Sequence, residues 1–260
     1  MSKFNSYLLA ACLLLAILQP ACATGKGPVA AALVNPARSA ADRERDLRDK
    51  PLQVLNFAGF RDGMTIADVF GGGGYYSEIL SGVVGENGKV LLINNAPYDA
   101  YVDKDVLAAR LDNGRLPNVE YMLVKNEAMG LGSNSLDGAM IIMSYHDLFY
   151  DDPEGGWPDV GHDQFIDQIV TALKPGGRLL IVDHAAKAGS DDKMTESLHR
   201  IDEQFAIDQL QMRGLTFVGS IPDLRNDDDN RELTVFDPEI RGKTDRFVHL
   251  YTKGGASGLE

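Results

Sequence analysis

The 260-residue sequence predicts an α/β domain in which helices cover both faces of a mostly parallel sheet. Short apolar runs, typical of buried strands, alternate along the chain with longer segments whose apolar residues recur at helical spacing. In addition, the glycine run Gly71–Gly74 joins the first of these strands to a helix. Strands separated by helices need crossover connections, which place a layer of helices on each side of the sheet. We therefore expect three layers.

Each predicted strand is a short apolar run bounded by turn residues. The first runs directly into the glycines, and the second follows the turn Glu86-Asn87-Gly88. The predicted strands are 65–70, 89–94, 119–124, 138–143, 178–182, 215–218 and 247–251.

The predicted helices show apolar residues at intervals of three or four. Phe165, Ile169 and Leu173 have this spacing before the fifth strand. Pro175 ends that helix, because proline disfavours helical geometry in the residue before it. Residues 38–50 are rich in charge and alanine, which predicts a solvated helix. The predicted helices are 38–50, 75–80, 103–111, 164–173 and 196–212.

Composition restricts the function class. Hydrophobic residues make up 44% and charged residues 24%, which excludes a mainly disordered, collagen-like or multi-span membrane protein. The 38 acidic residues outnumber the 25 basic ones, for a net charge of −13. Such a surface repels phosphate backbones, so we expect no nucleic-acid partner. It suits a cationic or neutral small molecule.

The amino-terminal segment has the pattern of a secretory signal peptide. Lys3 precedes an apolar run from Tyr7 to Leu18, and Ala21-Cys22-Ala23 provides a small-residue cleavage site. We therefore expect export, to the periplasm. The alternatives are a cytoplasmic protein and a lipid anchor on Cys22. The run is shorter than the about 20 residues of a bilayer span, so no stable membrane span is expected.

These features divide the chain into four parts. We expect a signal peptide at residues 1–23, a linker at 24–37, the folded domain at 38–253 and a flexible tail at 254–260.

In an open sheet of this kind, ligands bind outside the carboxyl ends of the strands, near the point where the strand order reverses. Glycines there let backbone amides approach a ligand, and the helix behind them favours an anionic group at its N-terminus. A dinucleotide fingerprint would need a small residue and then an acid about 20 positions on. Ser77 and Asn94 stand at these positions, so a nicotinamide cofactor fits poorly.

Three segments resemble class I S-adenosylmethionine-dependent methyltransferases. Ile66-Ala67-Asp68 with the glycine run resembles their first motif. Leu173 to Val182 looks like their entry into the fifth strand, and Gly214 to Phe217 precedes what matches their extra antiparallel strand. The resemblance covers residues 38–253. It implies a three-layer, Rossmann-like fold with a mostly parallel seven-stranded sheet and an antiparallel last strand, and it implies S-adenosylmethionine as the cofactor.

A narrower resemblance is to a bacterial group known only as predicted methyltransferases. It is carried by short motifs and suggests the cofactor but not the acceptor. The motifs are Tyr145-His146-Asp147, Asp183-His184, Leu198-His199-Arg200-Ile201-Asp202 and Lys243-Thr244-Asp245-Arg246-Phe247.

The family resemblance also implies cofactor-binding residues. Gly72 and Gly74 would line the methionine part, and Asp68 would anchor the loop or reach the amino group through water. Asn94 occupies the place of the acid that usually binds the ribose hydroxyls, and Glu127 the place of an adenine acceptor.

Aromatic faces beside the loop are a further candidate for cofactor contact. Tyr75, together with Phe70 and Tyr76, could attract a sulfonium through cation–π contact. The alternative for Phe70 and Tyr76 is a place in the core. Phe70 also replaces the usual first glycine of the loop.

The candidate catalytic residues are His146, Asp147 and His184, which follow the fourth and fifth strands. A histidine can take a proton from a hydroxyl or amine acceptor, and Asp147 could orient it. The alternative is a hydrogen-bonded pair that orders the loop. These residues and His199 could also converge on a metal, but their spacing is not local, so we expect none. Trp157 lies in a loop that forms either a lid or a surface anchor.

Two functions follow. The first is methyl transfer from S-adenosylmethionine to a small-molecule acceptor. The alternative is an exported methyltransferase-like fold that binds a ligand or has other chemistry, because S-adenosylmethionine is made in the cytoplasm. The sequence predicts no oligomeric state.

Overall fold

The computed structural model describes residues 27–190 and 194–254 of the chain. The strands are β1 (Thr65–Val69), β2 (Lys89–Asn94), β3 (Val119–Leu123), β4 (Leu136–Ile142), β5 (Leu173–His184), β6 (Leu215–Ser220) and β7 (Arg246–Lys253). Within these residues they form a seven-stranded sheet in the order β3-β2-β1-β4-β5-β7-β6. Neighbours pair in parallel, except that β7 is antiparallel to both β5 and β6. The predicted sheet, with its antiparallel last strand, is confirmed.

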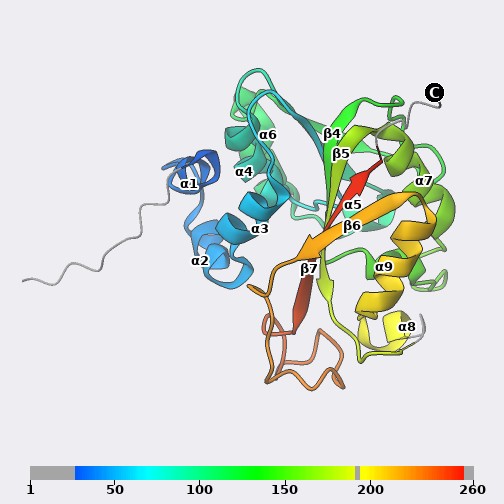
Figure 1. Cartoon of the computed structure of the whole chain (residues 1–260). Helices are drawn as coiled ribbons and strands as arrows, with labels where there is room; N and C mark the ends of the chain where they lie inside the picture. The colour runs from blue at the N-terminus through cyan, green and yellow to red at the C-terminus, as the bar shows by residue number, and fades with distance from the viewer. Residues whose placement is uncertain (1–26, 191–193, 255–260) are drawn as a thin grey trace, which may run out of the picture.

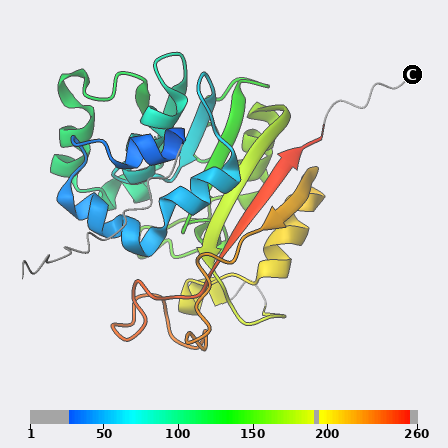
Figure 2. The same ribbon diagram turned by 60° about the vertical axis from the view of Figure 1, so that its left-hand side comes forward.

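The helices form the outer layers. They are α1 (Pro28–Leu33), α2 (Ala40–Asp49), α3 (Pro51–Ala58), α4 (Tyr75–Val84), α5 (Ala96–Tyr101), α6 (Lys104–Leu111), α7 (His162–Ala172), α8 (Met194–Leu198) and α9 (Glu203–Met212), with short 3₁₀ turns η1 (Asp112–Gly114) and η2 (His146–Phe149). Helices α1, α3 and α4 lie on one side of the sheet and α7 and α9 on the other (Figure 1). The amino-terminal helices, in blue, lie across one face (Figure 2).

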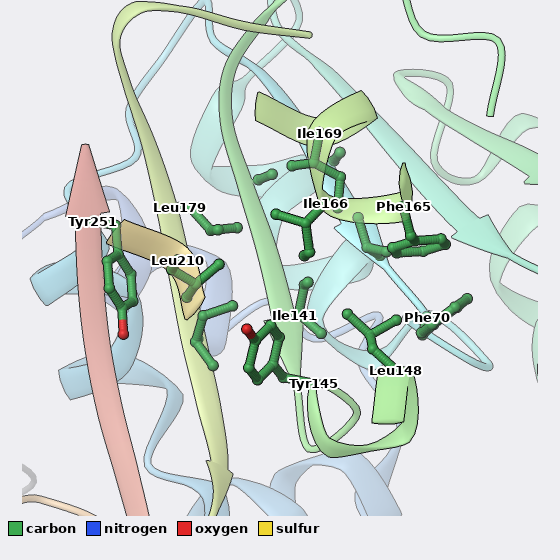
Figure 3. Close-up of a cluster of buried hydrophobic side chains, with 14 of the residues drawn as sticks. Phe70, Ile141, Tyr145, Leu148, Phe165, Ile166, Ile169, Leu179, Leu210 and Tyr251 are labelled. Carbon is green, nitrogen blue, oxygen red and sulfur yellow. The ribbon is translucent and has the colours of Figure 1, made fainter. Parts of the chain in front are cut away.

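The side chains of each strand point alternately to the two faces of the sheet, and this explains why the core forms two clusters, one on each face. Ile66 and Met140 pack with α1, α3 and α4 in one core cluster. Ala139 and Ile141 pack with α7 and α9 in the other, which Figure 3 shows in close-up. Both faces of the sheet are therefore buried, as expected for a parallel sheet.

The predicted helix at 196–212 is wrong as a single element. It is divided into α8 and α9 at His199, whose φ angle is 52°. Beyond the break, Ile201 forms a bridge with Ala185 beside the end of β5. The Asp202 side chain then caps α9 by accepting the Phe205 N–H at 2.7 Å. The capping acid and the strand-like pairing stop the helix from continuing.

The amino-terminal part of the domain also differs from expectation. Residues 28–33, predicted as linker, form α1, and Val29 and Ala32 are buried in the core cluster beside α4. The helix predicted at 38–50 is present as α2, but it is not solvated throughout, because its acids Asp42 and Asp49 are buried. The predicted signal peptide lies outside the described residues, as does the tail beyond residue 254.

No helix in the described part of the chain is both long enough and apolar enough to span a bilayer. Between β6 and β7, residues 221–245 extend past the sheet at the edge where β5 ends and β7 begins (Figure 1, orange). We call this segment the excursion. This edge is the carboxyl end of the parallel strands, where a ligand site is expected.

Candidate functional site

A cavity of about 530 Å³ opens at the carboxyl ends of β4 and β5. We call it the histidine cavity because His146, His184 and His199 line it together with Asp147. Its other walls are mainly aromatic. They comprise Tyr98, Tyr101, Tyr150, Trp157 and Phe236, together with Met143, Asp152, Gly155 and Val235.

The fold explains why these distant residues meet. His146 and Asp147 begin η2, which follows β4 closely, and His184 is the last residue of β5. Because β4 and β5 are parallel neighbours, their carboxyl ends lie side by side. His199 enters from the break between α8 and α9. The structure therefore brings all three candidate catalytic residues into one cavity.

His146 is held between two carboxylates. Its Nδ1 lies 2.8 Å from Oδ1 of Asp183, and its Nε2 lies 3.1 Å from Oδ1 of Asp147. Burial alone would lower the pKa of His146, but the two carboxylates outweigh it and raise the pKa well above the usual value. The same contacts, led by the charge of His146, overcome burial and lower the pKa of Asp147. A proton on His146 is therefore strongly retained.

His184 has the opposite electrostatic setting. Burial lowers its pKa well below the usual value, and the positive charges of His146 and Arg246 act in the same direction. Its Nδ1 lies 2.6 Å from the Thr244 hydroxyl. Of the two predicted bases, His184 is thus the one that stays neutral, and its lowered pKa makes it a weaker base than a free imidazole.

The side chains of Asn94 and Asp68 hold the glycine loop and the start of α4 through hydrogen bonds. The Gly72 N–H donates to Oδ1 of Asn94 at 3.0 Å, and Nδ2 of Asn94 donates back to the Gly72 carbonyl at 2.9 Å. Asp68 accepts a hydrogen bond from the Ser77 hydroxyl at 2.7 Å, which ties β1 to α4. Burial outweighs this bond and raises the pKa of Asp68 to about 6. Cofactor contacts by Asp68 and Asn94 remain predictions.

A second cavity, of about 290 Å³, borders the glycine loop, and we call it the loop cavity. Gly72 has a φ angle of 57°, and a Cβ placed on it would meet no atom within 4 Å. The lining residues are Asp42, Arg45, Gly71, Gly72, Gly73, Tyr75, Tyr98, Tyr101, Val102, Asp103, Val106 and Arg110. Gly72 and Tyr75 line the loop cavity, whereas neither cavity lining includes Gly74 or Glu127, and cofactor contact by all four stays a prediction.

The two cavities meet at Tyr98 and Tyr101, which line both. Tyr98 stacks on Phe70 with ring centroids 4.3 Å apart, and its hydroxyl donates to Asp147. Phe70 in turn stacks on Phe165 at 5.0 Å, beside Leu148 in the core cluster (Figure 3). Phe70 is therefore a core residue, the alternative that the sequence left open.

Sequence reasoning missed most of the aromatic wall. It named Trp157, which does line the histidine cavity. It did not name Tyr98 and Tyr101, which stand on α5 just after β2. Their position beyond a strand end was the available signal. Phe236 comes from the excursion between β6 and β7, and no local pattern marked it.

No family model matches the chain. In sequence, 130 residues, half of the chain, are 29% identical to the ubiquinone/menaquinone biosynthesis C-methyltransferase UbiE of Hahella chejuensis, covering 47% of that protein. The identity to the UbiE protein of Escherichia coli O1:K1 is also 29%, over 46% of its length. The chain thus spans about half the length of these curated relatives.

Solved structures are similar over most of the chain. An S-adenosylmethionine-dependent methyltransferase from Aquifex aeolicus matches 83% of this chain and 99% of its own, with a TM-score of 0.53 and 21% identity. The fold is that of the methyltransferases. An arsenic(III) S-adenosylmethionine methyltransferase from Chlamydomonas reinhardtii matches 90% of this chain and 76% of its own, with a TM-score of 0.53 and 16% identity.

The methyltransferase fold does not by itself decide the reaction. The [4+2]-cyclase SpnF shares it, with a TM-score of 0.56 and 17% identity over 85% of each chain. At identities this low the likeness concerns the fold, and the chemistry must be argued from the site.

The residues of the loop cavity fit the amino-acid part of S-adenosylmethionine. Gly72 leaves open space beside the backbone, as a closely approaching ligand needs. Arg45, which also pairs with Asp49, offers a cation for a carboxylate. Asp42, which also pairs with Arg110, and Asp103, which caps α6, offer anions for an ammonium or sulfonium group. The ribose position differs, because both polar atoms of the Asn94 side chain already bond to Gly72.

Proposed function

We propose that this protein catalyses methyl transfer from S-adenosylmethionine to a small aromatic acceptor that carries an ionisable hydroxyl group. One observation carries the proposal. The loop cavity and the histidine cavity share a wall at Tyr98 and Tyr101, at the point where the strand order reverses. A cofactor cavity and an acceptor cavity must adjoin if a methyl group is to pass between them.

The cofactor assignment is supported by the open glycine loop, by the charges around it and by the similarity to UbiE proteins. When bound, S-adenosylmethionine supplies a methyl group that is already activated as a sulfonium. Gly72 and Gly73 would hold it through the backbone, with Arg45 and Asp42 at its charged ends. Tyr75 also lines this cavity, with the guanidinium of Arg45 4.0 Å from the centroid of its ring.

The acceptor assignment rests on the walls of the histidine cavity. Tyrosine, tryptophan and phenylalanine rings form an apolar wall suited to a flat ring. Within the described residues, Nε2 of His184 has no hydrogen-bond partner, whereas Nδ1 contacts Thr244. We assign His184 the uptake of the hydroxyl proton, and the aromatic wall the exclusion of water. His146 and Asp147 would orient the acceptor oxygen.

Isothermal titration calorimetry with S-adenosylmethionine and S-adenosylhomocysteine tests the cofactor site. We expect saturable binding to the full chain, weakened tenfold or more in Gly72→Val, because the new side chain fills the space beside the loop. Gly130→Val is the matched control. Gly130 also has a positive φ angle, 72°, and open surroundings, so it carries the same backbone cost away from the cavity.

No heat with the folded wild-type protein at millimolar ligand would reject the proposed function. Equal loss of binding in both variants would assign the effect to backbone strain and not to the loop cavity.

A further inference from the structure

We propose that His146, Asp147 and His199 bind a divalent transition-metal ion at the wall of the histidine cavity. No metal was expected from the sequence, because the spacing of these residues is not local. The fold brings them together, and the inference goes beyond methyl transfer. Metal binding is measured without that activity, so the two proposals can fail separately.

Three potential ligand atoms converge. One ligand atom each from His146, Asp147 and His199 lies within 4.8 Å of the other two. Oδ1 of Asp147 is 3.1 Å from the His146 nitrogen and 3.6 Å from the His199 nitrogen. An ion with bonds of about 2.0–2.2 Å needs its ligands roughly 3–3.5 Å apart. Small side-chain adjustments are enough to reach that arrangement.

The neighbours of His146 are those expected around a metal ligand. Oδ1 of Asp183 accepts a hydrogen bond from Nδ1 of His146, which leaves the lone pair of the neutral ring on Nε2. That lone pair faces a carboxylate oxygen of Asp147 at 3.1 Å, so the two acceptor atoms need either a proton or a metal ion between them. The other oxygen of Asp147 accepts from the Tyr98 hydroxyl, which fixes the carboxylate. A metal ion would satisfy both atoms and His199 at once.

The ligand set indicates the class of metal. Two imidazoles and one carboxylate suit Zn²⁺ or Fe²⁺, whereas Mg²⁺ and Ca²⁺ prefer all-oxygen sites. All three residues line the cavity, so further coordination positions can face a bound molecule. An acceptor hydroxyl there would lose its proton more readily, because a bound cation lowers the pKa of a coordinated oxygen.

The test uses Co²⁺ as a spectroscopic probe and Zn²⁺ in competition with it. Metal-stripped full-length protein is titrated with Co²⁺, and visible absorption and metal content after dialysis are measured. We expect one ion per chain, displaced by Zn²⁺ and not by Mg²⁺. The sole tryptophan, Trp157, lines the same cavity, so its fluorescence should fall as Co²⁺ binds.

Two variants locate the ion. His199→Asn keeps a residue that tolerates the positive φ of this position, and it should weaken Co²⁺ binding at least tenfold. His162→Asn changes a histidine outside the cluster and should bind like the wild type. Absence of saturable Co²⁺ and Zn²⁺ binding, or unchanged binding in both His199→Asn and Asp147→Asn, would overturn the proposal. Metal binding without S-adenosylmethionine binding would support the metal site and reject the proposed function.

Discussion

At the scale of single residues, surroundings decide role more than residue type does. His146 and His184 both face one cavity, yet two carboxylates hold a proton on the first while burial and nearby cations keep the second neutral. In the same way, Asn94 is a polar residue at a strand end whose side-chain oxygen and nitrogen both bond to the backbone of the adjacent glycine loop. Roles that are assigned from motif position alone therefore have to be checked against the surroundings that the structure shows.

Replacing Asp68 by Asn should stabilise the protein at neutral pH. Burial raises the pKa of Asp68 from 3.8 to about 6, so the folded chain binds this proton more tightly than the unfolded chain. Stability contributed by the protonated form is present below pH 4 and is lost as the pH rises through 6. The gain of Asp68→Asn over wild type should rise from near zero below pH 4 to about 3 kcal/mol above pH 6.

Urea unfolding of both proteins at several pH values gives this difference, and contributions from other groups cancel. The Ser77 hydrogen bond can be kept by the amide oxygen of Asn. A difference that does not vary with pH would contradict the assignment.

At the scale of elements, apolar runs predicted all seven strands. The inner strands β1, β2 and β4 are largely buried on both faces and so have an almost unbroken hydrophobic signature, whereas the edge strands β3 and β6 are partly exposed. The helix at 196–212 was predicted as continuous because its apolar spacing does continue through the break. What divides it is tertiary. Arg200 is fully buried and pairs with Asp229 from the excursion between β6 and β7, at 2.8 Å. A contact over 29 residues leaves no local pattern.

In the candidate site, too, residues marked by a local sequence signal were predicted, whereas those placed by tertiary contacts were not. Positions next to strand ends, such as His146 and His184, were predicted from the sequence. Phe236 was not predicted, since it depends on the path of residues 221–245. The convergence of His199 with His146 was considered but not expected, since it depends on the break between α8 and α9.

Arg200→Met should destabilise the fold by about 3–5 kcal/mol, because it leaves the Asp229 carboxylate buried without its partner. The double variant Arg200→Met with Asp229→Asn should recover part of that loss. Thermal unfolding followed by circular dichroism measures both. A single variant as stable as wild type would show that the pair does not hold the excursion in place.

At the scale of the whole molecule, the methyltransferase fold and the amino-terminal signal pattern raise separate questions. The fold is shown, while export remains a prediction that the described residues do not address. If residues 1–23 are a signal peptide, the periplasmic fraction of expressing cells should contain a chain that begins at Thr24. Intact mass spectrometry detects this shortening. An uncleaved chain in the cytoplasm would contradict export, and an acylated Cys22 would indicate the lipid-anchored alternative.

Tyr98 stands between the loop cavity and the histidine cavity, stacked on Phe70 and bonded to Asp147. A ligand that displaces the Tyr98 ring from either cavity would change the shape of the other cavity. By thermodynamic reciprocity, each occupant then changes the affinity for its neighbour by the same factor. Binding in the two cavities would then be coupled through one phenol ring, that of Tyr98.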